Sequence, residues 1–192
     1  MPRQLYPDSA NKAAHFIDLC CQRDIPLLFL ADVTGFMVGR AAEQAGIAKA
    51  GAKMITAMAS ANVPKYTIII GASYGAGYLA MCGRPFNPTA MFAWPNARAA
   101  IMGPEQAATV MALVRRQINK TEGREWTPEE EEAFKAPVRK VYEDFQPADN
   151  FSSNLWADGI IDPVETRDVM GLMLDLASRT APKPTPFGIF RF

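Results

Sequence analysis

Apolar residues along the chain follow two patterns, a helical period in some segments and short unbroken runs in others. The helical period predicts helices over residues 9–21 and 46–61, and an unbroken apolar run at 25–33, opened by Pro26, predicts a buried strand. A second run, at 66–70, is rich in β-branched residues and predicts another buried strand. Helices and strands in alternation are typical of an α/β protein with a mainly parallel sheet flanked by helices.

The later elements continue this alternation. A further helix is expected after residue 77, a short third strand at 91–94, a helix that begins at Pro104, and a closing amphipathic helix at 166–178. In the first predicted helix, the helical period predicts one buried stripe, which consists of Ala13, Phe16, Ile17 and Cys20.

One domain is expected over residues 1–192, with two unusual segments inside it. Residues 119–146 carry dense charge, which predicts a charged helical insertion in the form of a solvated hairpin or lid. Three prolines keep the tail at 181–192 extended, and its aromatic residues Phe187, Phe190 and Phe192 need an element or another chain on which to pack.

Composition excludes several function classes. The 20 basic side chains balance 20 acidic ones, so no global field favours nucleic acid as a partner. The apolar runs are far shorter than the roughly 20 residues needed to span a bilayer. Residues 1–11 lack the pattern of a secretory signal, and we therefore expect a cytoplasmic location without a membrane anchor. Cys20, Cys21 and Cys82 form no metal-binding spacing and are interpreted as reduced core thiols.

Two glycine loops, at 34–39 and 71–77, follow predicted strands and precede predicted helices. An open α/β sheet usually binds its ligand at this edge, so a site is expected there. In the second loop, successive amides of residues 74–78 lie at the start of a helix, where they lack intrahelical acceptors. Two such donors can stabilise a carbonyl oxygen as it becomes anionic.

The second loop also matches the pattern G-x-S-x-G around Ser73, which would be a nucleophile in a hydrolase. A hydrolase of that kind needs a histidine later in the chain, whereas the single histidine, His15, lies far upstream. We therefore disfavour a catalytic triad, and the loop matches neither the dinucleotide nor the Walker pattern.

Several motifs together resemble one enzyme family. They are TGFMVG at 34–39, GIAKAGAKM at 46–54, NVPKYTIIIGASYGAG at 62–77, MCGR at 81–84 and WPNAR at 94–98. The chain resembles the carboxyltransferase (β) subunit of biotin-dependent acyl-CoA carboxylases, closest to the methylcrotonoyl-CoA and geranyl-CoA branch. The resemblance covers only the carboxyl-terminal half of such a subunit.

The resemblance implies a crotonase-like (ClpP/crotonase) ββα spiral and a ligase complex in which carboxybiotin on a separate carrier meets an acyl-CoA. In that family the active site lies between the amino-terminal domain of one protomer and the carboxyl-terminal domain of another. Expected partners are therefore the missing amino-terminal half, the biotin carboxylase and carrier subunit, and further copies of the chain. No metal is implied.

The resemblance also assigns residues. The amides of Ala76 and Gly77 would hold the biotin ureido oxygen, and Leu79 would lie beside the acyl group. The other residues implied in biotin binding are Gly35, Phe36, Met37, Val38, Gly39, Tyr74, Gly75 and Tyr78. The branch usually has Asn-Tyr-Gly where this chain has Tyr78-Leu79-Ala80, which leaves the acyl group open. Lys53 lies in a helix-forming run and is not expected to carry biotin.

Two other functions stay open. A free-standing crotonase-type hydratase or isomerase would need an acid or base, for which Asp32, Glu43 and Glu105 are the candidates near the loops. A non-catalytic module that assembles a carboxylase complex through its apolar tail is the third possibility.

Overall fold

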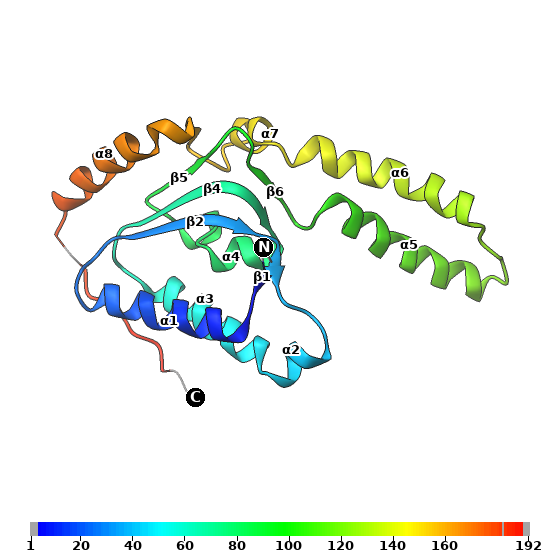
Figure 1. Ribbon diagram of the computed structural model, residues 1–192, viewed down its shortest axis with the longest axis horizontal. Helices are drawn as coiled ribbons and strands as arrows, with labels where there is room; N and C mark the ends of the chain where they lie inside the picture. Colours follow the sequence, from blue (N-terminus) through cyan, green and yellow to red (C-terminus); the bar gives the residue numbers. More distant parts are fainter. Residues whose placement is uncertain (1–3, 182, 190–192) are drawn as a thin grey trace.

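The computed structural model of the protein describes residues 4–181 and 183–189. Its main sheet holds five parallel strands, four of them in the order β2–β4–β5–β7, with β6 paired to the carboxyl-terminal part of β4 (Figure 1). The strands are β2 (Leu27–Val33), β4 (Lys65–Tyr74), β5 (Ala90–Ala93), β6 (Arg98–Ala100) and β7 (Gly159–Ile160). A small parallel pair is formed by β1 (Gln4–Leu5) and β3 (Gly35–Phe36). The predicted α/β architecture with a parallel sheet is confirmed.

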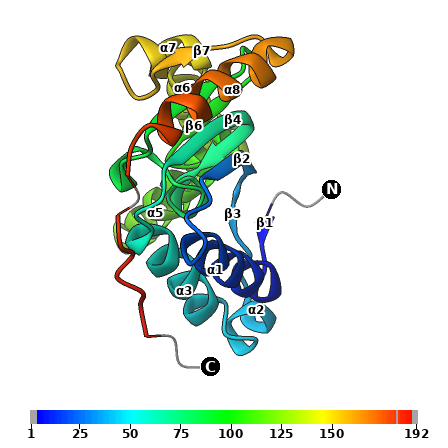
Figure 2. The same ribbon diagram turned by 90° about the vertical axis from the view of Figure 1, so that its left-hand side faces the viewer.

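Two helices, α1 (Pro7–Cys21) and α3 (Ile47–Ser60), lie side by side against one face of the sheet, with the short α2 (Arg40–Gln44) before α3 (Figures 1 and 2). The buried stripe of α1 runs through Ala10, Ala14 and Ile17, whereas Phe16 is 61% exposed, so the predicted stripe is wrong at that residue. Small alanines allow α1 to approach α3 closely, and a phenylalanine ring does not fit between them.

The other face of the sheet is covered by α8 (Thr166–Ser178), which has the bounds predicted for it. The Tyr66 hydroxyl of β4 donates a hydrogen bond to the carbonyl of Met173 in α8 at 2.9 Å. This helix packs over β4 and β5 but leaves the edge strand β2 uncovered. Leu28 and Leu30 are consequently 45% and 48% exposed, and the prediction of a fully buried strand is wrong for that side of β2.

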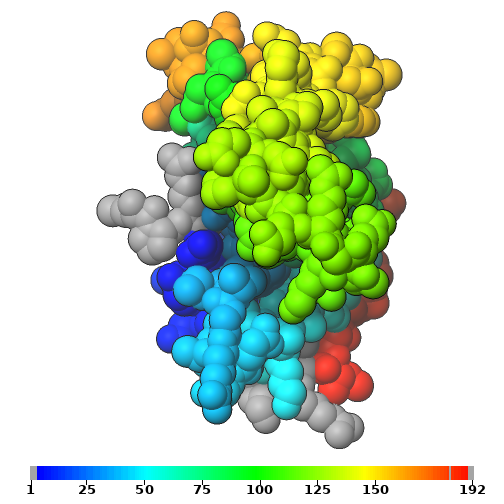
Figure 3. Space-filling model, turned by 90° about the vertical axis from the view of Figure 1, so that its right-hand side faces the viewer, coloured from blue at the N-terminus to red at the C-terminus, as the bar shows by residue number. Residues whose placement is uncertain are grey.

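A helical hairpin extends away from the sheet (Figure 1), and its green and yellow atoms face the viewer in Figure 3. It consists of α5 (Pro104–Thr121) and α6 (Pro128–Phe145), and α7 (Ala148–Ser153) follows it. Ion pairs join its helices, among them that of Arg139 with Glu105 at 2.7 Å. The predicted hairpin is thus present, but it begins at Pro104, well before the charge-dense segment.

The extended tail returns along the first layer of helices. The backbone N–H of Asn62 donates a hydrogen bond to the Thr185 hydroxyl at 3.2 Å, and this bond holds the tail next to the end of α3. Phe187 is exposed, and the predictions for Phe190 and Phe192 fall outside the described residues.

The three cysteines are buried and unbonded, as predicted, and burial raises the pKa of each thiol. Within residues 4–181 and 183–189, no helix has the length and apolar character required to cross a membrane, and no side-chain cluster suited to a metal is found.

Candidate functional site

Strand β4 continues into the second glycine loop and ends at Tyr74, instead of ending before the loop. The register between β2 and β4 shifts between Ala31 and Val33, and at this irregularity the Asp32 carboxylate accepts a hydrogen bond from the Ala72 amide at 2.9 Å. A Cβ atom at Gly71 would lie 2.4 Å from the same carboxylate oxygen. The aspartate and the glycine together direct the end of β4 toward β6.

Helix α4 (Gly75–Ala80) begins directly at the end of this strand. Gly75 has a φ of 51°, and a Cβ on it would lie 2.7 Å from the carbonyl oxygen of Ile101. The turn therefore requires glycine for its dihedral angle and for the close approach of a second backbone segment. No described side chain caps this helix. Among the described backbone hydrogen bonds outside helices and strands, none uses the amide of Ala76 or Gly77.

A cavity of about 900 Å³ opens beside the start of α4. Four residues assigned to the site from the sequence line it, namely Gly75, Ala76, Tyr78 and Leu79. The other lining residues are mostly apolar, with Ser73 and Arg84 as the polar exceptions. The apolar ones are Ile69, Pro85, Met91, Ala99, Ala100, Ile101, Phe145, Phe151 and Trp156.

The aromatic wall of the cavity could not be assigned from the sequence. Phe145 ends α6, Phe151 lies in α7, and Trp156 follows α7, with 5.3 Å between the ring centroids of Phe145 and Trp156. The buried Gln146 fixes this wall to the sheet, because its side-chain oxygen accepts from the Tyr74 hydroxyl at 2.6 Å. The base of the hairpin therefore closes one side of the cavity.

The remaining assigned residues lie elsewhere. Gly77 is buried, and a Cβ on it would be 3.0 Å from the backbone of Gly35 and 2.9 Å from Val33, so this residue packs α4 against the first glycine loop. Gly35 and Phe36 form β3, and Met37, Val38 and Gly39 follow it. The described lining of the cavity includes none of the residues at 35–39, nor Tyr74 or Gly77.

Most polar groups at the cavity are already satisfied. The Tyr78 hydroxyl accepts a hydrogen bond from the Arg84 amide at 2.8 Å, and burial raises the pKa of this phenol, which keeps it neutral. The Arg84 guanidinium pairs with the Asp158 carboxylate at 2.7 Å. Ser73 differs from both, since its buried hydroxyl has no hydrogen-bond partner in the described part of the chain.

Asp158 joins the cavity wall to the sheet. Its carboxylate also accepts from the Met91 amide at 2.7 Å. Burial alone would raise the pKa of Asp158, but the hydrogen bonds from Arg84 and Met91 outweigh it and hold the pKa below its ordinary value. A carboxylate with a lowered folded-state pKa stabilises the fold above its unfolded pKa, and this contribution is lost as pH falls through the folded value.

We expect Asp158→Asn to lower the free energy of unfolding by about 1 kcal/mol at pH 7, because the pair with Arg84 is partly exposed. The difference from the wild type should shrink below about pH 4, as the wild-type carboxylate is protonated. Urea unfolding across this pH range measures both effects. Asp144→Asn is the control, because it removes only an exposed pair with Lys140. An equal loss in both variants, or a difference that does not depend on pH, would contradict this role of Asp158.

The three carboxylates proposed as the acid or base of a hydratase lie away from the described lining of the cavity. Asp32 accepts from the Ala72 amide, Glu43 is exposed on α2, and Glu105 pairs with Arg139. The described cavity lining contains none of these three carboxylates, which disfavours the free-standing hydratase or isomerase.

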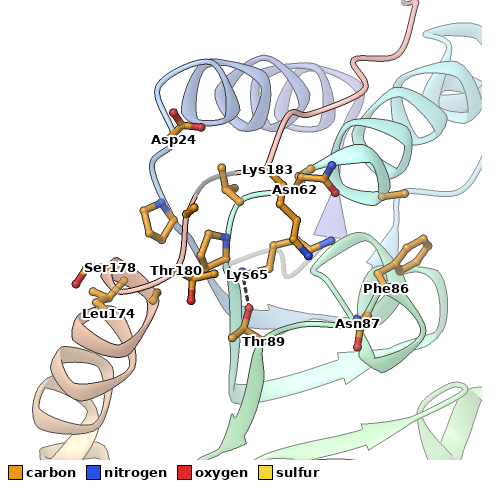
Figure 4. Close-up of a pocket in the computed structure, with 17 residues that line it drawn as sticks. Asp24, Asn62, Lys65, Phe86, Asn87, Thr89, Leu174, Ser178, Thr180 and Lys183 are labelled. Carbon is orange, nitrogen blue, oxygen red and sulfur yellow. Dashed lines mark hydrogen bonds between the residues drawn. The ribbon is translucent and has the colours of Figure 1, made fainter.

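A second pocket, of about 910 Å³, lies at the amino-terminal ends of the strands (Figure 4). Lys65 begins β4 there, and its amide donates to the Thr89 hydroxyl at 3.2 Å. The Lys65 ammonium donates to the carbonyl of Met58 near the end of α3 at 3.3 Å, so it caps that helix. Ligands of α/β sheets usually bind at the opposite ends of the strands, and we therefore place the candidate site at the first cavity.

Comparison with known proteins shows which family this chain matches. Residues 4–187 match the model of the carboxyl transferase domain. The chain is 54% identical over 187 residues to the biotin-dependent 3-methylcrotonyl-coenzyme A carboxylase beta1 subunit of Mycobacterium tuberculosis, covering 97% of this chain and 35% of that protein. It is also 54% identical to the methylcrotonoyl-CoA carboxylase beta chain of Arabidopsis thaliana, of which it covers 32%.

Solved structures agree with these relatives. The geranyl-CoA carboxylase beta subunit of P. aeruginosa superposes with a TM-score of 0.84 at 41% identity, over 98% of this chain and 36% of that one. The transcarboxylase 12S subunit, solved as a hexamer assembly, gives a TM-score of 0.80 at 33% identity, over 97% of this chain and 35% of the other. The crotonase-like fold expected from the resemblance is confirmed. The chain spans about a third of the length of these relatives.

Proposed function

Since the chain belongs to the carboxyl transferase domain family, we propose that it is the carboxyl-terminal part of a biotin-dependent acyl-CoA carboxyltransferase. The observation that carries this proposal is the cavity at the carboxyl end of β4, where the start of α4 presents open backbone amides beside an apolar wall. A carboxyl group would pass there from carboxybiotin to an acyl-CoA that is bound mainly by the amino-terminal part of such an enzyme.

The residues present suit a biotin ring. The apolar side chains of Leu79, Phe151 and Trp156 can contact its hydrocarbon part, and the amide of Ala76, which lines the cavity, can donate to its ureido oxygen. Gly77 does not belong to the described lining, and we propose its amide as a second donor because it lies in the same first turn of α4. When bound, carboxybiotin would supply the carboxyl group: its N–CO₂ bond would break, a C–C bond would form to the acidic acyl-chain carbon whose carbanion is conjugated with the thioester carbonyl, and the ring nitrogen would take the proton that this acyl-chain carbon loses.

The chain's own contribution is electrostatic and positional. The amides at the start of α4 are fixed by the backbone and need no reorganisation when negative charge develops on the oxygen beside them. The apolar side chains of the wall offer no competing hydrogen bonds and lower the local polarity, which strengthens those made by the amides. We assign Ala76 and Gly77 as donors, with Gly75, Tyr78 and Leu79 as the surrounding contacts. Gly35 would act indirectly, since its backbone packs against Gly77.

Exposed apolar side chains support the need for partners. Leu28 and Leu30 on β2, and Leu113 and Val114 on α5, are each about half exposed, which is typical of surfaces that another chain or domain covers. We propose that the amino-terminal half, further copies of this chain and the biotin carboxylase and carrier subunit complete the enzyme. Location in the cytoplasm stays a prediction.

Reconstitution tests the proposed function. The chain is mixed with carboxybiotin and 3-methylcrotonyl-CoA, with and without the amino-terminal half, and labelled carboxyl transfer is measured. We expect transfer only in the combined sample. Hydration of an enoyl-CoA by the chain alone would instead indicate a hydratase, and a stable complex without turnover would indicate an assembly module.

A further inference from the structure

Ser73 carries a buried polar group that the proposed mechanism leaves unused. Its side chain is 1% exposed, and its hydroxyl has no partner in the described part of the chain. Buried hydroxyls normally form hydrogen bonds, so an unpartnered one at the edge of a cavity points to a missing ligand.

The strand register shows where this side chain points. Ser73 of β4 pairs with Ala99 of β6 in a parallel ladder, and paired residues of parallel strands have their side chains on the same face of the sheet. Ala99 packs on the buried cluster that contains Ile69, and all three residues line the candidate cavity. The Ser73 hydroxyl therefore faces the floor of this cavity.

The hydroxyl and the open amides are near neighbours along the chain. A serine three residues before a helix amide often caps that amide, but the Ser73 oxygen and the Ala76 amide form no such bond. The other polar side chains at the cavity, Tyr78 and Arg84, are engaged with protein groups. Among the described lining residues, Ser73 thus has a buried side-chain oxygen whose hydrogen-bonding capacity is unused.

We propose that the Ser73 hydroxyl donates a hydrogen bond to the biotin ureido oxygen and acts as a third donor beside the amides of Ala76 and Gly77. This inference rests on the proposed function and adds a side chain to a site otherwise built from backbone groups. A hydroxyl donor contributes more as the oxygen becomes anionic, because hydrogen bonds to charged groups are stronger than those between neutral ones.

The test uses the complete carboxyltransferase with the amino-terminal half present, and free biotin as the probe. Ser73→Ala should raise the Kd for free biotin, measured by calorimetry, by about threefold to tenfold. It should lower kcat for carboxyl transfer by about tenfold to a hundredfold, with KM for the acyl-CoA unchanged. The melting temperature should stay equal or rise, since the substitution removes an unpartnered buried hydroxyl. Ser73→Thr, which keeps a hydroxyl, should restore most of the activity.

Ser152→Ala is the matched control. Its hydroxyl is also buried without a described partner, but Ser152 does not belong to the described cavity lining. This variant should match the wild type in biotin binding and in kcat. If Ser73→Ala behaves like Ser152→Ala, the inference is overturned while the proposed function stands. The same conclusion follows if Ser73→Ala lowers both the activity and the melting temperature and Ser73→Thr does not restore the activity. A wild-type enzyme that neither binds biotin nor transfers a carboxyl group overturns both.

Discussion

Gly75→Ala is expected to lower the free energy of unfolding by about 2–4 kcal/mol and to reduce carboxyl transfer by about a hundredfold. The stability loss has two causes. The φ of 51° at this residue is unfavourable for alanine, and the added Cβ would lie 2.7 Å from the Ile101 carbonyl oxygen. Relief of this clash must move the start of α4 or the end of β6, and either movement displaces the amide of Ala76. Urea unfolding and a transfer assay measure the two effects.

Gly123→Ala separates the two causes. Gly123 follows α5 with a φ of 70°, and a Cβ on it would meet nothing within 4 Å. Only the dihedral cost of about 1 kcal/mol should appear, with transfer unaffected, because this turn lies at the far end of the hairpin (Figure 1). Equal stability losses in the two variants would show that the contact with Ile101 does not matter.

Local patterns in the sequence predicted many of the helices and strands of the fold. The closing helix α8 and the two strands before the glycine loops are visible in the sequence because apolar period and β-branched content are local properties. A cavity beside the second glycine loop was also predictable, since this loop leaves the carboxyl end of a parallel strand, whereas the first loop does not belong to the described lining. The assignment of Gly75, Ala76, Tyr78 and Leu79 to one cavity follows from that topology and from the family resemblance.

The rest of the cavity depends on contacts between distant parts of the chain. Phe145, Phe151 and Trp156 close it from the base of the hairpin, about 70 residues after the glycine loop, and no fixed spacing links them to Ala76. An aromatic residue near a helix end was equally compatible with an ordinary core. The three-residue strand β6, which brings Ile101 over Gly75, is too short to give a period.

Exposure of β2 shows another limit of sequence patterns. The run at 25–33 has the apolar content of a strand covered on both faces, yet Leu28 and Leu30 are exposed. An apolar pattern predicts that a face of the strand is buried, but it does not indicate whether the element that covers this face belongs to the same chain. This distinction between covering elements of the same chain and of another chain matters here, because the chain spans about a third of the length of its relatives.

Ala76→Pro is expected to abolish carboxyl transfer, with a loss of more than about a hundredfold, while the chain stays folded. Proline removes the amide hydrogen that we assign to the ureido oxygen. Ala76 is the second residue of α4, and an amide in the first turn of a helix has no intrahelical acceptor, so its removal breaks no helix hydrogen bond. The same reasoning predicts that Kd for free biotin rises in this variant. Circular dichroism and the melting temperature establish that the variant is folded.

Ala48→Pro is the matched control, because Ala48 is exposed and is also the second residue of its helix, α3. It places the same substitution at the same helical position away from the described cavity lining, and we expect wild-type transfer from it. If both variants lost activity, the effect would come from proline in a first turn and not from the missing donor. If Ala76→Pro retained normal transfer, the backbone of α4 would not hold the developing charge, and the donors would have to be sought among the side chains, with Ser73 first.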